Sequence, residues 1–411
     1  MATQSKKILV INSGSSSLKF MLFNMPEETM VVKGLVERIG TPQADMVYQK
    51  AGEAKHEEPG VAENHGKALA MVCKKLVDPK DGVLKSLGEV NAIGHRVLHC
   101  AEYYSDSVAV DENVKAVIKK CFPLGPLHNP ANLEGIVACG TVFPGVLNVI
   151  VIDTAFHQTM PKYAYLYAIP KKFYEEDHIR KYGFHGTSHK FVTQATAKFL
   201  GKPADKLNVI ICHLGNGSSI AAIKNGKVFD TSMGLTPLAG LIMGTRSGDV
   251  DPAVVVALAR KGYSIDKVDH ILNKESGLKA INGIDSGDMR DTIAAADAGN
   301  PDAQNALQMF AHRIALYIGG YYTLIGGAEA VIFTGGIGEN SAPARKLIIE
   351  RLKALGCDID EKRNSITRGT SGVISADGSK LKAIVIPTNE ELMIARDTYR
   401  IFNEKKQQSS K

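Results

Sequence analysis

Two arginines and a histidine in this sequence lie in segments where their side chains could bind an anion. Arg96 occurs in Gly-His-Arg-Val-Leu-His, and Arg246 occurs in a loop of small residues, Met-Gly-Thr-Arg-Ser-Gly-Asp. A guanidinium on such a loop favours an anionic ligand over a packed ion pair, although a surface salt bridge remains the alternative for each arginine. His185 lies in Gly-Phe-His-Gly-Thr-Ser-His. We expect it to donate a hydrogen bond to a transferring phosphoryl group.

Two glycine-containing segments could hold phosphate or a nucleotide. Residues 12–17 are small and polar and are followed by Lys19, which is the combination that phosphate binding requires. Residues 334–340 follow an apolar strand and precede a helix expected near Pro343, so their glycines permit close backbone approach to a nucleotide. Neither segment has the GxGxxG pattern of a dehydrogenase, and the sequence has no GxxxxGK[ST] motif. A P-loop enzyme is therefore excluded.

Acidic residues near the expected ends of two elements suggest a divalent cation. Asp153 ends a predicted strand, and Glu390 begins the last predicted helix. Oxygen ligands of this kind suit Mg²⁺, which keeps several waters and takes few protein groups. Zinc is an alternative, because histidines concentrate at residues 183–189, with His128 and His157 elsewhere, but the carboxylates and the spacing do not form a metalloprotease pattern.

Short apolar runs alternate with amphipathic stretches along the chain, which predicts an α/β fold. The expected strands are residues 8–11, 18–23, 90–94, 146–152, 209–211, 330–334 and 384–386. The expected helices are residues 61–77, 188–200 and 301–325.

An internal similarity suggests that the fold is duplicated. Residues 8–20 and 209–223 each read as strand, Gly/Ser turn and strand, about half a chain apart. Two such hairpins could hold one polyphosphate between them, and 411 residues favour two domains. The alternative is two unrelated hairpins, since Gly/Ser turns are common.

Composition excludes several classes of protein. The excess of 49 Lys and Arg over 43 Asp and Glu is small and scattered, with no basic stripe, so we expect no nucleic-acid partner. The 6 cysteines lie far apart, which favours reduced thiols in a cytoplasm over zinc or disulfides. The apolar run near the start is too short for a signal peptide, and no stretch is long enough to span a membrane, so we expect a cytoplasmic location.

Over nearly its whole length the sequence resembles the acetokinase family of the actin, Hsp70 and sugar-kinase superfamily. The motifs that carry the resemblance occur in order at residues 11–19, 94–97, 126–130, 153–157, 183–189, 213–217, 230–237, 243–252, 334–340 and 387–391. The resemblance implies a duplicated actin-like, ribonuclease H-like fold of two domains, at residues 1–153 with 388–411 and at 154–387, with a nucleotide cleft between them. It also implies a homodimer that transfers the γ-phosphoryl group of ATP to acetate with Mg²⁺, giving acetyl phosphate and ADP.

The resemblance further implies roles for particular residues. Asp153, His185 and Arg246 would be catalytic, and Asn12 and Glu390 would serve Mg²⁺. The expected acid-binding residues are Arg96, Leu98, Leu127, His128, Phe184 and Pro237. The expected ATP-binding residues are Lys19, His213, Leu214, Gly215, Asn216, Gly217, Asp288, Met289, Arg290, Gly335, Gly336, Ile337, Gly338, Glu339 and Asn340.

The sequence departs from the family pattern close to the expected acid site. Cys100 and Ala101 stand where two glycines are usual, Gly125 where alanine is usual, and Leu98 where valine is frequent. An added methylene at position 98 disfavours acids longer than acetate. The alternatives are a propionate or butyrate kinase of the same superfamily and an ATP-dependent binding protein of the Hsp70 or actin type.

Overall fold

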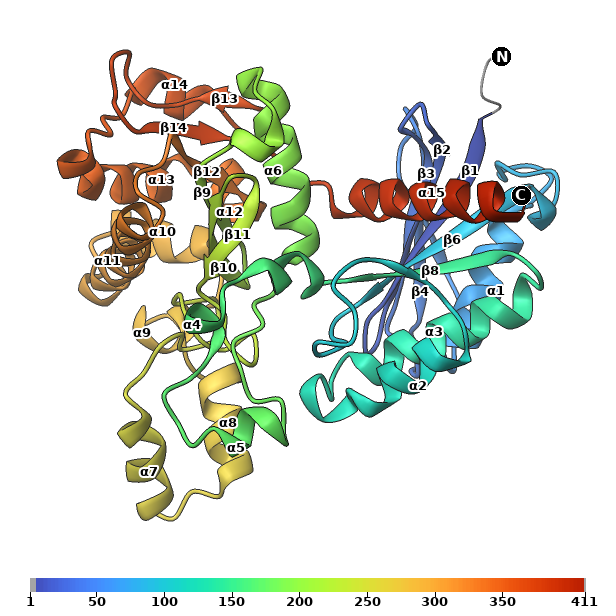
Figure 1. The fold of residues 1–411 in the computed structure, drawn as a ribbon, viewed down its shortest axis with the longest axis horizontal. Coiled ribbons are helices and arrows are strands. Elements are labelled where there is room, and N and C mark those ends of the chain that lie inside the picture. The colour runs from blue at the N-terminus through green and yellow to red at the C-terminus, as the bar shows by residue number, and fades with distance from the viewer. Residues whose placement is uncertain (1–4, 410–411) are drawn as a thin grey trace. The chain divides into compact units, whose positions relative to one another are not determined.

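The computed structural model describes residues 5–409, which form two compact units (Figure 1). Unit 1 combines the chain up to Phe156 with the segment that begins at Asn389, and unit 2 spans His157–Thr388. The domain bounds expected from the sequence lie slightly earlier in the chain, at 153/154 and 387/388, at both points where the chain passes from one unit to the other. Among residues 5–409, no helix combines the length and apolar character needed to cross a bilayer.

Unit 1 is built on an eight-stranded sheet with the order β5-β4-β3-β2-β1-β6-β8-β7. Its centre is the hairpin of β1 and β2, and β1 pairs in parallel with β6, which pairs in parallel with β8. The strands are β1 Lys6–Ser13, β2 Leu18–Met25, β3 Thr29–Glu37, β4 Asp45–Lys50, β5 His56–Pro59, β6 Val90–Val97, β7 Val108–Ala109 and β8 Leu147–Ile152. The helices are α1 His65–Leu76, α2 Glu112–Lys120, α3 Asn129–Val142 and α15 Glu390–Ser409.

The alternation of apolar residues along β1 places helices on both faces of this sheet. Ile8 and Val10 are buried together with Ile394 of α15, whereas Leu9 and Ile11 are buried together with Leu69 of α1. Successive side chains of a strand point to opposite faces, so one continuous apolar run supplies two cores. Figure 1 shows α15 (red) running across this sheet.

Unit 2 repeats the central order of unit 1 in a six-stranded sheet, β11-β10-β9-β12-β14-β13. Here β9 and β10 form the hairpin, and β9, β12 and β14 are parallel. The strands are β9 Val209–Leu214, β10 Ser218–Lys224, β11 Lys227–Thr231, β12 Ala330–Thr334, β13 Gly372–Val373 and β14 Lys382–Val385. The predicted duplicated α/β fold is therefore confirmed by matching strand order and direction in the two units.

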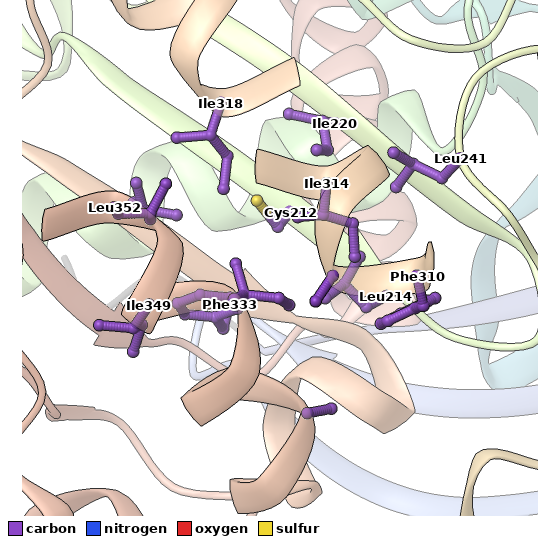
Figure 2. Packing of buried hydrophobic residues seen from close by; sticks show 14 of the residues in the cluster. Cys212, Leu214, Ile220, Leu241, Phe310, Ile314, Ile318, Phe333, Ile349 and Leu352 are labelled. Atoms are coloured by element: carbon purple, nitrogen blue, oxygen red, sulfur yellow. The ribbon is translucent and has the colours of Figure 1, made fainter. Parts of the chain in front are cut away.

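The core of unit 2 lies between its sheet and the long helix α11, Pro301–Leu324. Cys212 and Leu214 of β9 pack with Phe333 of β12 and with Phe310 and Ile314 of α11 (Figure 2). The other helices are α4 Lys162–Tyr165, α5 Lys172–Glu175, α6 Gly186–Leu200, α7 Pro252–Arg260, α8 Ile265–Lys274, α9 Leu278–Ile281, α10 Met289–Asp297, α12 Gly335–Asn340, α13 Ala342–Ile349 and α14 Glu361–Ile366.

Two local predictions need correction. The first helix begins at His65 and not near residue 61, because the side chain of Asn64 accepts a hydrogen bond from Lys67 N and caps the helix there. The strand predicted at 90–94 continues to Val97, since its parallel pairing with β8 extends that far. Arg96 is therefore a strand residue and does not follow the strand.

Candidate active site

In unit 1 the site residues gather where β1, β6 and β8 end. Asn12 lies near the end of β1 and pairs across the hairpin with Lys19 of β2. The ammonium group of Lys19 forms an ion pair with Glu391 at the start of α15. The expected metal and phosphate residues of unit 1 thus stand beside the helix that carries Glu390.

Arg96 and Asp153 form the central ion pair of unit 1. Arg96 lies on β6 and Asp153 directly follows β8, with Arg96 Nη2 and Asp153 Oδ2 3.1 Å apart. The Asp153 carboxylate is fully buried, while the Arg96 side chain keeps 19% of its surface exposed. Asp153 raises the pKa of Arg96, against the opposing effect of burial. The guanidinium therefore carries a permanent charge beside a buried carboxylate.

Glu390 adds a further carboxylate to this group. Burial raises its pKa to about 7, while Arg96 lowers the pKa and Asp153 and Glu391 raise it. Among residues 5–409, no three His, Cys, Asp or Glu side chains are arranged to hold a metal ion by themselves. The oxygens of Asn12, Asp153 and Glu390 nevertheless fit Mg²⁺, which needs few protein ligands, and the crowded carboxylates favour an added cation.

In unit 2, His185 stands at the start of α6, where its backbone conformation and a hydrogen bond to a serine fix the position of its ring. It adopts a left-handed conformation with φ of 58°. Its Nδ1 lies 2.9 Å from Ser219 Oγ on β10, and its ring stacks on His213 with centroids 4.2 Å apart. His213 Nδ1 in turn lies 2.8 Å from Ser188 Oγ. This arrangement leaves Nε2 of His185 on the side of the β9 to β10 turn.

Arg246 and His185 converge on Gly217 in that turn. A β-carbon built on Gly217 would lie 3.5 Å from Arg246 Nη1 and 3.5 Å from His185 Nε2. Arg246 Nη1 donates to the carbonyl of Pro237 at 3.0 Å, and Arg246 forms no ion pair with any residue of the described range. Burial lowers its pKa, although the group stays a cation. An anion beside Gly217 would meet both side chains.

A pocket of about 800 Å³ in unit 2 lies next to this turn. The expected ATP-binding residues that line it are Gly215, Asn216, Asp288, Met289, Arg290, Gly336, Ile337 and Asn340. The sequence prediction missed five further lining residues, Gly287, Ile293, Ser341, Pro343 and Arg368. Arg290 is fixed on the wall by Asp288, whose Oδ2 accepts from its Nη2 at 2.6 Å. The pocket has the size of a small-molecule site.

The remaining expected ATP-binding residues of unit 2 have other surroundings. The Leu214 side chain is buried in the core, as Figure 2 shows, so it cannot contact a nucleotide. The expected role of Leu214 at the ATP site stays a prediction, which its backbone would have to fulfil. Glu339 Oε1 accepts from Gly335 N at 2.9 Å and from Thr388 N at 3.0 Å. His213, Gly217, Gly335, Gly338 and Glu339 do not line the pocket.

Residues 334–340 also differ from the expected glycine loop. Gly335–Asn340 forms the short helix α12, whose first N–H group is satisfied by Glu339. Gly335 has φ of 75°, and a β-carbon there would come within 2.7 Å of Leu214 O. Only glycine fits this close approach, which sets α12 directly against the end of β9.

The expected acid-binding residues are divided between the units. In unit 1, Leu98 is buried beside Gly125, whereas Leu127 exposes 65% of its surface and His128 is half-buried at the start of α3. Unit 1 alone therefore does not join Leu98 and Leu127 into one apolar wall. In unit 2, Phe184 is buried and Pro237 is half-buried next to Arg246.

Comparisons with known proteins agree over nearly the whole chain. The model of the acetokinase family matches residues 7–396. The acetate kinase of Finegoldia magna is 52% identical over 96% of this chain and 99% of its own length. The crystal structure of Porphyromonas gingivalis acetate kinase is 42% identical, with a TM-score of 0.92 over 96% of this chain and 99% of its own. The structure of a propionate kinase from Francisella tularensis is 43% identical, with a TM-score of 0.90 over 96% and 100% of the two chains.

Proposed function

This chain belongs to the acetokinase family, and from that membership we propose that it is an ATP-dependent acetate kinase. The reaction transfers the γ-phosphoryl group of ATP to acetate, giving acetyl phosphate and ADP, and is reversible. The observation that carries the proposal is the convergence of Arg246 and His185 on Gly217, beside the pocket of unit 2.

The chemistry demands positioning and charge neutralisation more than proton transfer. A carboxylate oxygen of acetate forms the new bond to the γ-phosphorus, and the bond from that phosphorus to the bridging oxygen of ADP breaks. A simple carboxylic acid has a pKa near 4.3 and is already an anion at neutral pH, so no strong base is needed. We therefore assign Asp153 to orienting Arg96 and metal-bound water.

The two units supply different parts of this chemistry. In unit 2, the Arg246 guanidinium and the Nε2–H group of His185 donate to the oxygens of the transferring phosphoryl group, while the pocket binds the nucleoside. In unit 1, Arg96 binds the acetate carboxylate, and Lys19 with residues 12–17 binds phosphate oxygens. His128 and Leu98 border the acid.

Mg²⁺ completes the proposal for unit 1. Asn12 and Glu390, with Asp153 nearby, would hold the ion or its waters. When bound, the ion neutralises phosphate charge that develops during transfer. The support is the oxygen donor set and the raised pKa of Glu390, because a carboxylate that resists ionisation gains from a neighbouring cation.

Hydroxylamine trapping of acyl phosphate tests the function. The purified protein would be incubated with ATP, Mg²⁺ and either acetate, propionate or butyrate, and hydroxamate and ADP would be measured together. We expect equal amounts of both products, and the highest kcat/KM with acetate. ADP without hydroxamate would indicate an ATP-dependent binding protein, and a preference for propionate would indicate a propionate kinase, as in the similar structure from Francisella tularensis.

We also propose that the enzyme is a homodimer within the cell. Helix α7 has no buried residue although it is rich in valine and alanine, with Val254 and Val256 exposing 39% and 48% of their surface. An apolar helix face of this kind favours association. All six cysteines are free and buried, which suits a reducing compartment. Light scattering on the purified protein measures the oligomeric state.

A further inference from the structure

Helix α3 of unit 1 buries two asparagines on the face that it turns toward the sheet. Asn129 is fully buried and Asn132 exposes only 3% of its surface. They are three residues apart on the helix, so their side chains lie on one face, which continues through Gly135. A buried amide is costly unless its hydrogen bonds are made, so each needs a specific reason to be there.

The side-chain amide of Asn132 joins the ends of two neighbouring strands. Its Nδ2 donates to the carbonyl of Ser13, the last residue of β1, at 2.7 Å. Its Oδ1 accepts from the backbone N–H of Leu98, the residue that follows β6, at 3.1 Å. Because β1 and β6 are parallel neighbours, both ends lie at the same edge of the sheet. One donor and one acceptor on a single planar group satisfy both backbone groups.

In the proposed reaction the two strand ends are assigned to the binding of different substrates. Ser13 lies in the segment of residues 12–17, which is assigned to phosphate and Mg²⁺. Leu98 follows Arg96 and is assigned to the acid. The two hydrogen bonds of Asn132 therefore link, through one side chain, the strand end assigned to the nucleotide and the strand end assigned to the acid.

We propose that Asn132 is a positioning residue that couples the binding of MgATP to the binding of acetate. When one substrate fixes its strand end, the Asn132 amide holds the other end in register, so the second substrate binds to an ordered site. This inference rests on the proposed function. It concerns a residue that is assigned to neither substrate and acts through Ser13 and Leu98.

Two neighbours on α3 contact only one side each and serve as matched controls. Asn129 contacts the acid side, where its Oδ1 accepts from His99 N at 3.2 Å and its Nδ2 donates to His99 O at 2.8 Å. Gly135 contacts the phosphate side, since a β-carbon built there would lie 2.2 Å from Ser13 Oγ. Asn129→Asp and Gly135→Ala therefore disturb one strand end at a time.

The test is Asn132→Asp, which keeps an acceptor for Leu98 N but removes the donor to Ser13 O. We expect both the acetate KM and the MgATP KM to rise about fivefold, the effect of roughly one neutral hydrogen bond, with a smaller change in kcat. In the parent, saturating MgATP should lower the acetate KM, and the variant should lose this dependence. Asn129→Asp should raise mainly the acetate KM, and Gly135→Ala mainly the MgATP KM.

Calorimetry with MgADP, with and without acetate, gives a readout that does not need turnover. Loss of the acetate effect on MgADP affinity in Asn132→Asp, with the effect retained in both controls, would support the coupling. A change in one KM only, or equal loss of coupling in all three variants, would overturn it. If the parent itself forms no acyl phosphate, the proposed function fails instead, and the two failures are thus distinct. Thermal melting of each variant checks that it is folded.

Discussion

In unit 1 the cations Arg96 and Lys19 are paired with carboxylates, whereas Arg246 of unit 2 is not. Arg96 pairs with Asp153 and Lys19 pairs with Glu391. Within the described part of the chain, the guanidinium of Arg246 donates hydrogen bonds only to Pro237 O and Met243 Sδ. Binding an anion in unit 1 therefore competes with existing pairs, while the charge of Arg246 is already available to a ligand.

The two units also differ in which atoms shape the site. In unit 2 Gly335 allows a close backbone approach to Leu214, and the side chains of Arg246 and His185 lie beside Gly217. In unit 1 buried side chains such as Asp153 and Asn132 hold the strand ends. Substitutions of Arg246 or His185 in unit 2 should therefore act on the transfer step, and those of Arg96 in unit 1 on substrate affinity.

The largest effect should follow from Arg246→Ala. We expect kcat to fall about 10³-fold or more, because the guanidinium of Arg246 would contact the transferring phosphoryl group. Alanine leaves no cation in its place. Arg246→Lys should restore little, since a point charge cannot donate two parallel hydrogen bonds. Steady-state kinetics would measure both, with Arg96→Ala raising mainly the acetate KM. A loss in kcat below about tenfold for Arg246→Ala would contradict a role of Arg246 in the transfer step.

Metal dependence should change only through unit 1. Asn12→Ala and Glu390→Ala each remove an oxygen near the expected Mg²⁺, so the Mg²⁺ concentration for half activity should rise about tenfold, or roughly 1.4 kcal/mol. Titration of activity with Mg²⁺ at fixed ATP measures this, and ATP binding without metal is the control that should not change. Unaltered titrations in both variants would contradict the assignment of Mg²⁺ to Asn12 and Glu390.

Substrate size should respond to Leu98 by a smaller factor. An apolar pocket discriminates one methylene by about 10 to 200-fold, so kcat/KM should be higher for acetate than for propionate. Propionate should remain a poor but measurable substrate. Leu98→Ala should narrow the gap several-fold, mainly through a lower KM for propionate. Leu127→Ala is the matched control, because that side chain is already 65% exposed. An acetate-to-propionate ratio equal to that of the parent would show that Leu98 is ordinary core.

The smallest effect concerns backbone strain near the acid side of unit 1. Ala101 has φ of 47°, a conformation that glycine adopts at lower cost. Ala101→Gly should raise the free energy of unfolding by about 1 kcal/mol, measured as the urea midpoint, whereas the reverse exchange Gly335→Ala in unit 2 should lower it. A lower midpoint for Ala101→Gly would show that the alanine side chain contributes more by packing than it costs in strain.

Sequence patterns predicted the sheet cores well because their signals are local. The hairpins at 8–20 and 209–223 combine apolar alternation with Gly/Ser turns, and both appear as β1 with β2 and β9 with β10. The short helix α12 was missed because glycine disfavours helix on propensity. It depends on the Glu339 carboxylate and on the close approach to Leu214 O, which are contacts that no local pattern records.

The site was predictable only where residues carry charge or lie in motifs. Arg96, Asp153, His185 and Arg246 were singled out from the sequence, and the structure places each pair together within its own unit. Asn132 was missed, since a single asparagine gives no sign of what it contacts. Ser219 lies in the predicted Gly/Ser hairpin, but its contact with His185 was not predicted. Arg368 was missed for another reason, because it reaches the pocket from a loop remote in sequence from the motifs.

The position of α15 in the chain has a consequence for synthesis. This helix covers one face of the sheet of unit 1, with Ile394, Ala395 and Phe402 packed against Ile8 and Phe23. All of unit 2 lies between that sheet and the helix in the sequence. On the ribosome unit 2 can therefore complete its core first, while the strands of unit 1 keep an uncovered apolar face until the helix emerges. The first strands of the nascent chain thus stay partly uncovered until α15 is synthesised, and a pause in translation after residue 388 would leave that face accessible to chaperones.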